Sequence, residues 1–312
     1  MKFFTADEVH RTLDYPFLIN ALEAAHGGVH PFGDHMVAED PGGSGNAFVS
    51  LLGWKSGSAI AAKLVGVFPG NQRLDPPQAS VQGIVAVFDP ATGAPRVVAD
   101  GEAMTFRKTA ADSGLGARFL AREDARVLLI VGAGGLAPHV LAAHRAARPS
   151  IDRVMIWNRS PKRAEALAAR VAEPGLTVEA VTDLDAAVAQ ADVISCVTMS
   201  DQPLVKGALL KPGAHLDLVG AYRTDMREAD DDAMARGSLF VDTRHGMEGA
   251  GDLFQPVQAG RIAFSDIRAD FYDLAQGRHP GRQSAEEITV FKNVGGGHLD
   301  LFTAEALMAR AG

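Results

Sequence analysis

The segment 126–137 joins a short apolar run to a glycine-rich turn, and it constrains the fold more than any other part of the sequence. Residues 126–131 read RVLLIV, the next six read GAGGLA, and an alanine-rich helix is expected from Ala137. This order is typical of a buried strand that enters a helix through a phosphate-binding loop, where backbone N–H groups and the helix N-terminus meet a pyrophosphate. The sequence therefore predicts a dinucleotide site.

The small residues of this loop have separate predicted roles. Gly132 makes the tight turn, Gly134 lets the backbone approach the phosphate, and Ala137 keeps the helix close to the strand. Gly135 and Leu136 complete the loop, so all five residues are expected cofactor-binding positions.

About twenty residues further on, the position that distinguishes the two nicotinamide nucleotides holds no acidic residue. A second apolar run ends at Trp157 and is followed by Asn158, Arg159 and Ser160, with Arg163 close behind. A carboxylate there would bind the 2′-hydroxyl of NAD, whereas amide, guanidinium and hydroxyl groups donate to a 2′-phosphate. We expect NADP(H) as the cofactor, with NAD possible. The alternative interpretation is a polar turn and a solvated helix start.

Composition excludes several classes of function. The net charge of −8 and the lack of a basic run argue against a nucleic-acid partner. The histidines show no paired metal-ligand spacing, so no metal is expected. Cys196 is the only cysteine, which indicates a reducing compartment, and its place in an apolar run favours packing over nucleophilic catalysis. No stretch resembles a signal peptide or a membrane span, so we expect a cytoplasmic protein without a membrane partner.

Two kinds of pattern follow each other along the 312 residues, of which 47 % are apolar. Helical spacing runs from Thr5 to His26, and a helix is expected over 105–121. Between them the sequence predicts strands at 47–52, 59–68 and 81–88, with a hairpin turn at 89–93.

From about residue 125 to residue 293, short apolar runs alternate with helical segments. The expected strands are 127–131, 154–157, 177–180, 193–197, 214–219 and 239–241, and the expected helices include 137–148 and 161–172. Such alternation predicts an α/β fold, a Rossmann-type doubly wound parallel sheet. We expect this domain over 119–295, and a second, α+β domain built from 1–118 together with 296–312, whose last helix packs back on the first domain.

Several further motifs occur in a fixed order. Lys63–Asn71 resembles a K-x-x-x-x-F-P-x-N signature, Asp89–Gly93 a D-x-x-T-G hairpin, and Thr105–Ala111 a T-x-x-R-T-A-A helix start; Pro212–His215 and Thr289–Gly295 match two later segments. With the glycine loop, these motifs make the chain similar to the ornithine cyclodeaminase/mu-crystallin family over nearly its whole length.

The resemblance implies a homodimer in which the N-terminal strands and the C-terminal helix form a dimerisation and substrate domain. It also implies that the Rossmann domain holds a nicotinamide against a small imino or amino acid. Thr198, Met199, Val219 and Val294 fall in segments expected to contact the cofactor, while His298 is equally a helix residue or a donor. Family members include an ammonia-releasing lyase that converts ornithine to proline, cyclic-imine reductases, amino-acid dehydrogenases and a thyroid-hormone binder.

One position separates the lyase from the reductases. The cyclodeaminase carries a catalytic Asp after a pair of glycines, and the aligned residue here is Tyr222. Without that carboxylate the deprotonation and ring-closure steps lose their base, so the chain resembles the reductase branch. Asp225 could replace the missing base if the loop were shifted, but a helix-capping role is the commoner one for such a residue.

Charge points to a substrate carboxylate. Lys63 interrupts an apolar run, where a lysine must either reach solvent at an edge or meet an anion, and the resemblance assigns it to the substrate carboxylate. Lys108 stands where the family has an arginine, so a point charge replaces a bidentate fork. An early arginine of the family has no counterpart, and His35, read as a loop residue, is the candidate for its role. Arg107 is expected to be a phosphate contact or a surface residue.

These observations predict an NADP-dependent oxidoreductase that reduces the C=N bond of a small, cyclic imino acid such as pyrroline-2-carboxylate or piperideine-2-carboxylate to an L-amino acid. Lys63 is the expected catalytic residue, and Lys63, Lys108 and His35 are expected to bind the substrate. The proton source for the imine stays open. Two alternatives are an ornithine cyclodeaminase that uses bound NAD, and a non-enzymatic NADP-dependent ligand-binding protein.

Overall fold

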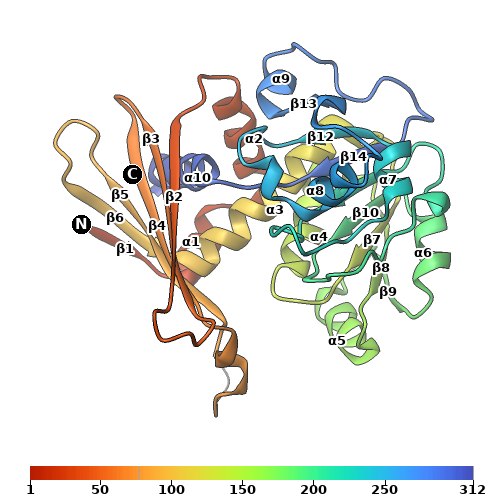
Figure 1. The fold of residues 1–312 in the computed structure, drawn as a ribbon, viewed down its shortest axis with the longest axis horizontal. Helices are drawn as coiled ribbons and strands as arrows, with labels where there is room; N and C mark the ends of the chain where they lie inside the picture. Colours follow the sequence, from red (N-terminus) through yellow and green to blue (C-terminus); the bar gives the residue numbers. More distant parts are fainter. Residues whose placement is uncertain (77, 312) are drawn as a thin grey trace. The chain divides into compact units, whose positions relative to one another are not determined.

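The computed structural model describes residues 1–76 and 78–311 and contains two compact units, each with its own sheet (Figure 1). Unit 1 comprises Met1–Ala25, Val29–Lys108 and the segment from Gly295 onward; unit 2 comprises His26–Gly28 and Thr109–Val294. The border lies inside helix α3 (Gly101–Leu120), earlier than the expected border after residue 118.

Unit 1 is built on a six-stranded sheet with the order β1-β6-β5-β4-β3-β2. Only β1 runs parallel to its neighbour, and the other pairs are antiparallel. Its strands are β1 (Lys2–Phe4), β2 (Phe32–Glu39), β3 (Ala47–Lys55), β4 (Ala59–Val67), β5 (Val81–Phe88) and β6 (Pro95–Asp100). Its other elements are α1 (Ala6–Thr12), most of α2 (Tyr15–His26), the short helix η1 (Pro69–Arg73) and α10 (Gly297–Ala311), which packs against β2 to β5.

The alternation of β4 places one row of side chains against α10. Ala59, Ala61, Lys63 and Val65 are buried, and the residues between them are only partly covered. As period-two alternation requires, the whole buried set lies on one face of the sheet. The predicted packing of the last helix on the first domain is therefore confirmed, and a lysine lies in the covered row.

The predicted hairpin turn at 89–93 is also confirmed. The Asp89 carboxylate accepts the N–H groups of Ala91 and Thr92, each at 3.0 Å, and Gly93 has a φ of +70°. This is an aspartate-capped turn that ends in a left-handed glycine, so the D-x-x-T-G motif has a local physical cause.

The structure refines one expectation for unit 1 and contradicts another. The helical segment from Thr5 to His26 is two helices, because Asp14 accepts the N–H of Phe17 at 3.0 Å and Pro16, in the first turn, starts a new helix. The stretch around His35, read as a loop, is strand β2. This strand is exposed over most of its length and shows no alternation, so its sequence carried no strand pattern.

Unit 2 is built on an eight-stranded parallel sheet with the order β13-β12-β14-β11-β10-β7-β8-β9. Its strands are β7 (Val127–Val131), β8 (Arg153–Trp157), β9 (Thr177–Val181), β10 (Val193–Cys196), β11 (His215–Leu218), β12 (Ser238–Val241), β13 (Ile267–Ala269) and β14 (Thr289–Lys292). Its helices are most of α3, then α4 (Ala137–Ala147), α5 (Pro161–Val171), α6 (Leu184–Gln190), α7 (Asp231–Arg236), α8 (Gly251–Gln258) and α9 (Phe271–Ala275), with short turns η2 (Gly207–Leu209), η3 (Met247–Gly249) and η4 (Phe264–Asp266).

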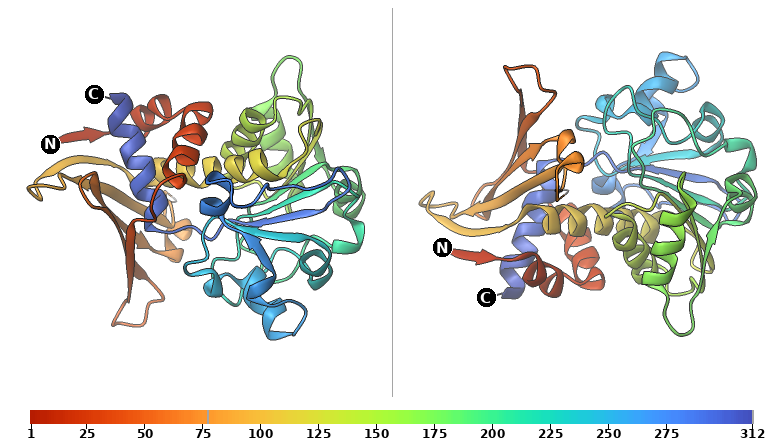
Figure 2. Two further views of the ribbon diagram at one scale, coloured as in Figure 1. Left: turned by 90° about the horizontal axis from the view of Figure 1, so that it is seen from above. Right: turned by 90° about the horizontal axis from the view of Figure 1, so that it is seen from below.

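Strand order reverses beside β7, because the chain continues outward through β8 and β9 and then returns to β10 on the other side. Figure 2 shows helices on both sides of this sheet. The predicted Rossmann-type doubly wound fold is confirmed, and the switch point between β7 and β10 is where such sheets bind ligands. Strands β13 and β14 were not predicted; β14 comes last along the chain yet pairs between β11 and β12.

A short piece of the first helical region joins unit 2. Gln276 donates to the carbonyl oxygens of His26 and Gly28 at 3.2 and 2.9 Å, and the His26 ring meets Phe271 edge-on at 5.3 Å. Residues 26–28 therefore belong to unit 2, while the chain on either side of them belongs to unit 1.

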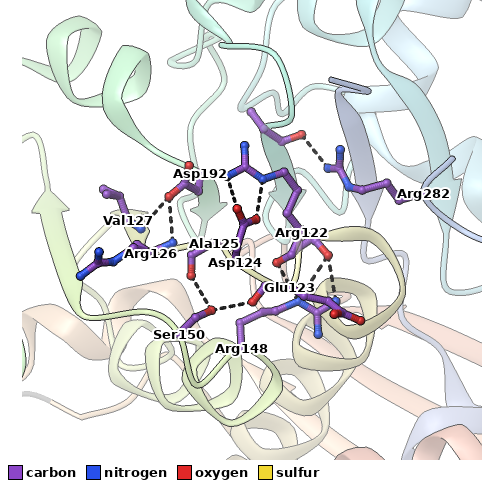
Figure 3. A network of polar contacts seen from close by, with 12 residues as sticks. Arg122, Glu123, Asp124, Ala125, Arg126, Val127, Arg148, Ser150, Asp192 and Arg282 are labelled. Atoms are coloured by element: carbon purple, nitrogen blue, oxygen red, sulfur yellow. Dashed lines mark hydrogen bonds and ion pairs between the residues drawn. The ribbon is translucent and has the colours of Figure 1, made fainter. Parts of the chain in front are cut away.

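Charged residues brace the amino-terminal end of β7 (Figure 3). The Asp192 carboxylate accepts the amides of Arg126 and Val127 at 2.8 and 2.9 Å. The largely buried Arg148 donates to backbone carbonyls at the end of α3, including that of Ala121 at 2.8 Å. These charges hold the entry to the sheet, at the opposite end of β7 from the glycine loop. None of the helices in residues 1–76 and 78–311 has the length and apolarity needed to cross a bilayer.

Candidate functional site

The loop after β7 has the backbone geometry of a tight turn. Gly132 has a φ of +119°, and its N–H donates to the carbonyl of Trp157 at 2.8 Å. A Cβ at Gly132 would lie 2.8 Å from the carbonyl oxygen of Val197, so a side chain fits neither the conformation nor the space. The loop therefore depends on glycine at this position.

The next three residues present a row of backbone donors. Gly134 and Gly135 are exposed, and within the described part of the chain the amides of Gly134, Gly135 and Leu136 have no acceptor. A Cβ at Gly134 would meet nothing within 4 Å, so the glycine faces open space. Helix α4 begins at the fully buried Ala137, and its positive end adds to these donors. Such a row can hold a pyrophosphate.

The end of β8 supports this loop. Asn158 Oδ1 accepts the amide of Ala133 at 3.3 Å, and its Nδ2 donates to the carbonyl of Ser160 at 3.0 Å. The side chain proposed as a donor to a 2′-phosphate is thus engaged in holding the glycine loop against the following turn. Sequence reasoning did not include this bracing role.

Three basic side chains lie at the start of α5. Arg159, Lys162 and Arg163 are all exposed, and over residues 1–76 and 78–311 none of them forms an ion pair. Ser160 precedes the helix, and its side chain makes no capping hydrogen bond. The cations and the hydroxyl therefore remain available to an anion beside the glycine loop.

A buried carboxylate joins the carboxyl ends of β10 and β11. Glu228 Oε1 accepts the N–H of Thr198 at 2.6 Å and its hydroxyl at 2.7 Å, while Oε2 accepts the N–H of Gly220 at 2.7 Å. Burial, together with the neighbouring carboxylate of Asp252, raises the pKa of Glu228 to about 7. This residue fixes the two loops that follow the central strands.

Lys292 connects β14 to the same group. Its buried ammonium donates to the carbonyl of Gly220 and lies 3.3 Å from Asp252 Oδ2, whose partner oxygen accepts the N–H of Glu228 at 2.8 Å. Sequence reasoning missed Glu228, Asp252 and Lys292. The sequence did contain a signal for Lys292, because this lysine directly follows an apolar run, just as Lys63 lies within one.

The other expected cofactor contacts lie at the same end of the sheet. Thr198, Val219 and Val294 are partly exposed and follow β10, β11 and β14, and Met199 is 75 % exposed. The N–H of Val294 is held by Asp242 Oδ1 at 2.8 Å. The fold thus brings these residues to one edge, where parallel sheets bind ligands. Their contacts with a cofactor stay predictions.

The loop after β11 lacks the base of the cyclodeaminase. Tyr222 is 57 % exposed and follows Ala221, which has a φ of +51°. Asp225 does not cap a helix as expected; it pairs on the surface with Arg223 at 2.7 Å, and α7 is capped by Asp230. Hydrogen bonds from Arg223 lower the pKa of Asp225.

Unit 1 contributes a second group of charges. Asp300 Oδ2 of α10 lies 3.3 Å from the Lys63 ammonium of β4 and 3.8 Å from the Lys108 ammonium of α3. All three residues are buried, with exposures of 1 %, 7 % and 6 % in that order. Burial lowers the pKa of Lys63 most; Asp300 opposes this shift and Lys108 adds to it, and together they leave the pKa at about 8. The two predicted lysines meet, and Asp300 was missed.

The other candidates of unit 1 have different surroundings. His35 aligns with Leu51 and Lys63 across β2, β3 and β4, so it lies on the same sheet face as Lys63, two strands away, and is exposed. Its substrate role stays a prediction. Arg107 is half-buried rather than a free surface residue, because it donates to His10 Nδ1 at 3.0 Å and stacks on a tyrosine ring of α2. The phosphate contact expected for it stays a prediction.

Two residues for which the sequence offered only weak reasons to expect a functional role, His298 and Cys196, are buried packing residues in this structure. His298 is buried in α10, with its ring 5.4 Å from that of His30. Cys196 is a fully buried free thiol, and burial raises its pKa well above the ordinary value, which confirms a packing role. Within the described ranges, no group of three or more His, Cys, Asp or Glu residues could hold a metal ion.

The parallel sheet, its glycine loop and the donors at its carboxyl edge define a dinucleotide-binding protein of the Rossmann type. The sequence profile of the Ornithine cyclodeaminase/mu-crystallin family matches residues 50–311, and the chain belongs to that family.

Similar proteins lie in the imine-reductase branch of the family. The chain is 46 % identical over 257 residues to Delta(1)-pyrroline-2-carboxylate reductase of Paracoccus denitrificans, covering 82 % of this chain and 81 % of that one. It is 33 % identical to ketimine reductase mu-crystallin of Rattus norvegicus, covering 97 % and 95 %. The solved Thermococcus litoralis Delta(1)-pyrroline-2-carboxylate reductase, in complex with NADH and L-proline, is 27 % identical with a TM-score of 0.93, covering 100 % and 97 %.

Proposed function

We propose that this protein is an NAD(P)H-dependent reductase of a small, cyclic imino acid such as pyrroline-2-carboxylate or piperideine-2-carboxylate, and that it forms the corresponding L-amino acid. The observation that carries the proposal is the pair of buried ammonium groups in unit 1, Lys63 and Lys108. The similar proteins described above are named as reductases of cyclic imines or ketimines, which supports the same class of reaction.

The lysine pair is suited to a carboxylate. Each ammonium has three donors, and among the described residues the ion-pair partner of both is the single oxygen Asp300 Oδ2. Buried donors without acceptors are costly, so a ligand that supplies oxygen atoms stabilises this group. A substrate carboxylate supplies two. Lys63 is proposed to touch the substrate, with Lys108 beside it.

Unit 2 is suited to a nicotinamide nucleotide. The unpartnered amides of residues 134–136 and the open space at Gly134 fit a pyrophosphate. When bound, the nucleotide supplies the hydride that the carbon of the protonated C=N bond accepts, so that carbon gains a C–H bond and nitrogen keeps its proton. Thr198, held by Glu228, is proposed to line the nicotinamide ribose.

We further propose a preference for NADP(H) over NAD(H). Its support is the unpaired cationic group of Arg159, Lys162 and Arg163 with the uncommitted hydroxyl of Ser160. A 2′-phosphate beside these donors gains charge-assisted hydrogen bonds that a ribose hydroxyl does not.

The cyclodeaminase alternative is disfavoured by the loop after β11. Tyr222 replaces the required carboxylate, and Asp225 is tied to Arg223 on the surface, so neither supplies a buried base. The ligand-binder alternative differs from the reductase only in turnover, which the assay below measures.

A homodimer is proposed from the uncovered face of the sheet in unit 1. In the strand register, Trp54, Ile60 and Phe88 form one row, and Phe48 and Ile84 belong to the same face, opposite the face that carries Lys63. Trp54 is 46 % exposed and Phe48 48 % exposed. Because a broad apolar sheet face is costly in water, we propose that a second copy of the chain covers it. The buried free thiol of Cys196 suits a reducing, cytoplasmic setting.

The function is tested by following nucleotide absorbance with NADPH or NADH and a panel of pyrroline-2-carboxylate, piperideine-2-carboxylate and ornithine. We expect oxidation of the reduced nucleotide with a cyclic imine and formation of proline or its homologue. Ammonia release from ornithine without net nucleotide oxidation would support the lyase instead. Tight nucleotide binding with no turnover of any imine would leave only the ligand-binding role.

A further inference from the structure

We infer that Asp300 is a positioning residue of the carboxylate site: it holds the ammonium groups of Lys63 and Lys108 beside each other and sets their combined charge so that the site accepts a single carboxylate. The inference rests on the proposed function, because it assumes that this group of charges binds a substrate. It concerns a residue that the sequence motifs did not indicate.

The geometry shows that the Asp300 carboxylate serves the two cations alone. One oxygen, Oδ2, faces both ammonium groups at 3.3 and 3.8 Å. Among the described residues, neither oxygen accepts a hydrogen bond from a backbone N–H or a hydroxyl group. Asp300 lies in the first turn of α10 but is buried and flanked by Leu299 and Leu301. A carboxylate that neither caps a helix nor closes a turn is left with a role toward the lysines.

Charge balance indicates what the site takes. Two protonated lysines and one ionised aspartate leave a net charge of one positive. A bound monocarboxylate brings the group to neutrality, whereas a dicarboxylate leaves a buried negative charge without a partner, which is unfavourable. Asp300 therefore favours imino acids with one carboxylate over those with two.

The negative charge of Asp300 also favours the protonated form of Lys63. The charged groups that face Lys63 are Asp300 from α10 and Lys108 from α3, and the adjoining strands β3 and β5 present the apolar Leu51 and Val85 in register with it. Burial and Lys108 lower the pKa of Lys63 and Asp300 raises it, and the balance of these effects is a pKa of about 8. Removal of the negative charge must therefore lower the pKa further, so that Lys63 loses its proton closer to neutrality.

The first test follows this protonation directly in the full-length protein. The Lys63 side-chain signals are titrated by ¹³C,¹⁵N nuclear magnetic resonance and assigned by their loss in Lys63→Met. We expect Asp300→Asn to lower the midpoint of Lys63 by roughly one pH unit or more. Glu305→Gln, which removes a half-buried carboxylate of the same helix that pairs with Lys55, is the matched control and should leave the midpoint unchanged. An equal midpoint in wild type and Asp300→Asn would overturn the inference.

This measurement needs no turnover, so it separates the inference from the proposed function. If no imine is reduced but the midpoint of Lys63 falls in Asp300→Asn, the reductase fails while the counter-ion role of Asp300 stands. A second variant guards against a folding defect. Asp300→Glu retains the charge, and we expect it to keep the midpoint near that of the wild type; a midpoint as low as that expected for Asp300→Asn would contradict the inference.

The second test addresses charge selection. Calorimetric titration compares pyrrole-2-carboxylate with pyrrole-2,5-dicarboxylate, two planar rings that differ by one carboxylate. We expect the wild type to bind the monocarboxylate more tightly, and the ratio of the two dissociation constants to shrink several-fold in Asp300→Asn at a pH below the Lys63 midpoint. A ratio that is the same in both proteins would show that shape alone makes the selection. If Asp300 had a purely structural role, the affinities for both ligands would fall by the same factor in Asp300→Asn.

Discussion

Single side chains decide the chemistry proposed for unit 1. A lysine in an apolar strand costs free energy unless it meets an anion, and Lys63 meets Asp300 only through one oxygen. Lys108 shares that oxygen from another element. Neither pairing uses all the ammonium donors, which leaves donors for the substrate carboxylate that we propose.

Lys63→Met tests the substrate contact. The change removes a charge-assisted hydrogen bond but keeps an apolar stem of similar length, so we expect kcat/KM for the imino acid to fall roughly 10- to 100-fold. Nucleotide affinity should stay unchanged. Lys55→Met, which removes a partly exposed lysine of the neighbouring strand, is the control. Full activity in Lys63→Met would make Lys63 a structural lysine.

The pKa of Lys63 predicts a pH dependence of carboxylate binding. Only the ammonium form attracts the anion, and its pKa lies at about 8, below the ordinary value for lysine. Affinity should therefore be present below that pH and be lost as the pH rises through it. Calorimetry with pyrrole-2-carboxylate, whose carboxylate stays ionised throughout, reports the protein titration alone. Constant affinity from about pH 6 to about pH 10 would contradict the prediction.

Arg159→Asp tests the proposed nucleotide preference. A carboxylate at this position would repel a 2′-phosphate and accept from a ribose hydroxyl, so NADPH affinity should fall roughly 10- to 100-fold while NADH affinity changes little or improves. Arg170→Asp makes the same charge change at the other end of α5 and is the control. Equal losses for both nucleotides, measured by fluorescence titration, would remove the 2′-phosphate assignment.

At the scale of elements, local sequence explains the glycine loop but not every strand. The loop needs a positive φ at Gly132 and free space at Gly134, and the spacing of its glycines indicates both, although the Val197 carbonyl that would meet a Cβ at Gly132 is distant in sequence. Strand β14 could not be read in this way, because its four buried residues resemble any short apolar run. Strand β2 was missed for the opposite reason, since an exposed edge strand has no apolar face.

Two glycine variants separate folding from nucleotide binding. Gly132→Ala places a Cβ against the backbone of Val197 at an unfavourable φ, so we expect a loss of roughly 1–3 kcal/mol in the free energy of unfolding. Gly134→Ala meets nothing in the protein and should leave stability unchanged, yet it blocks the approach of a pyrophosphate. Thermal unfolding and nucleotide titration distinguish the two. Unchanged nucleotide affinity in Gly134→Ala would contradict the phosphate-loop assignment.

At the scale of the whole molecule, the sheet of unit 1 leaves one apolar face for a partner. Helix α10 covers the face that carries Lys63, and aromatic and aliphatic side chains of β3, β4 and β5 lie on the other. The surface is formed by strands that are consecutive in sequence, but its extent depends on their register. It is the physical basis of the proposed homodimer.

Trp54→Glu tests that assembly. A charge within an apolar interface is costly to bury, so we expect the variant to be monomeric in multi-angle light scattering at micromolar concentration, while the wild type is a dimer. Val29→Glu changes an equally apolar exposed residue outside this face and should not alter the mass. A monomeric wild type, or a Trp54→Glu dimer, would contradict the proposal.

The sequence by itself determined the features whose physical cause is local. The positive-φ glycine at 132, the aspartate-capped turn at 89–93 and the alternation that buries Lys63 each follow from residues a few positions apart. The tertiary structure alone decided which distant charges meet. Asp300 reaches Lys63 and Glu228 joins two strand ends only because elements far apart in the chain pack together, and no spacing in the sequence encodes those contacts.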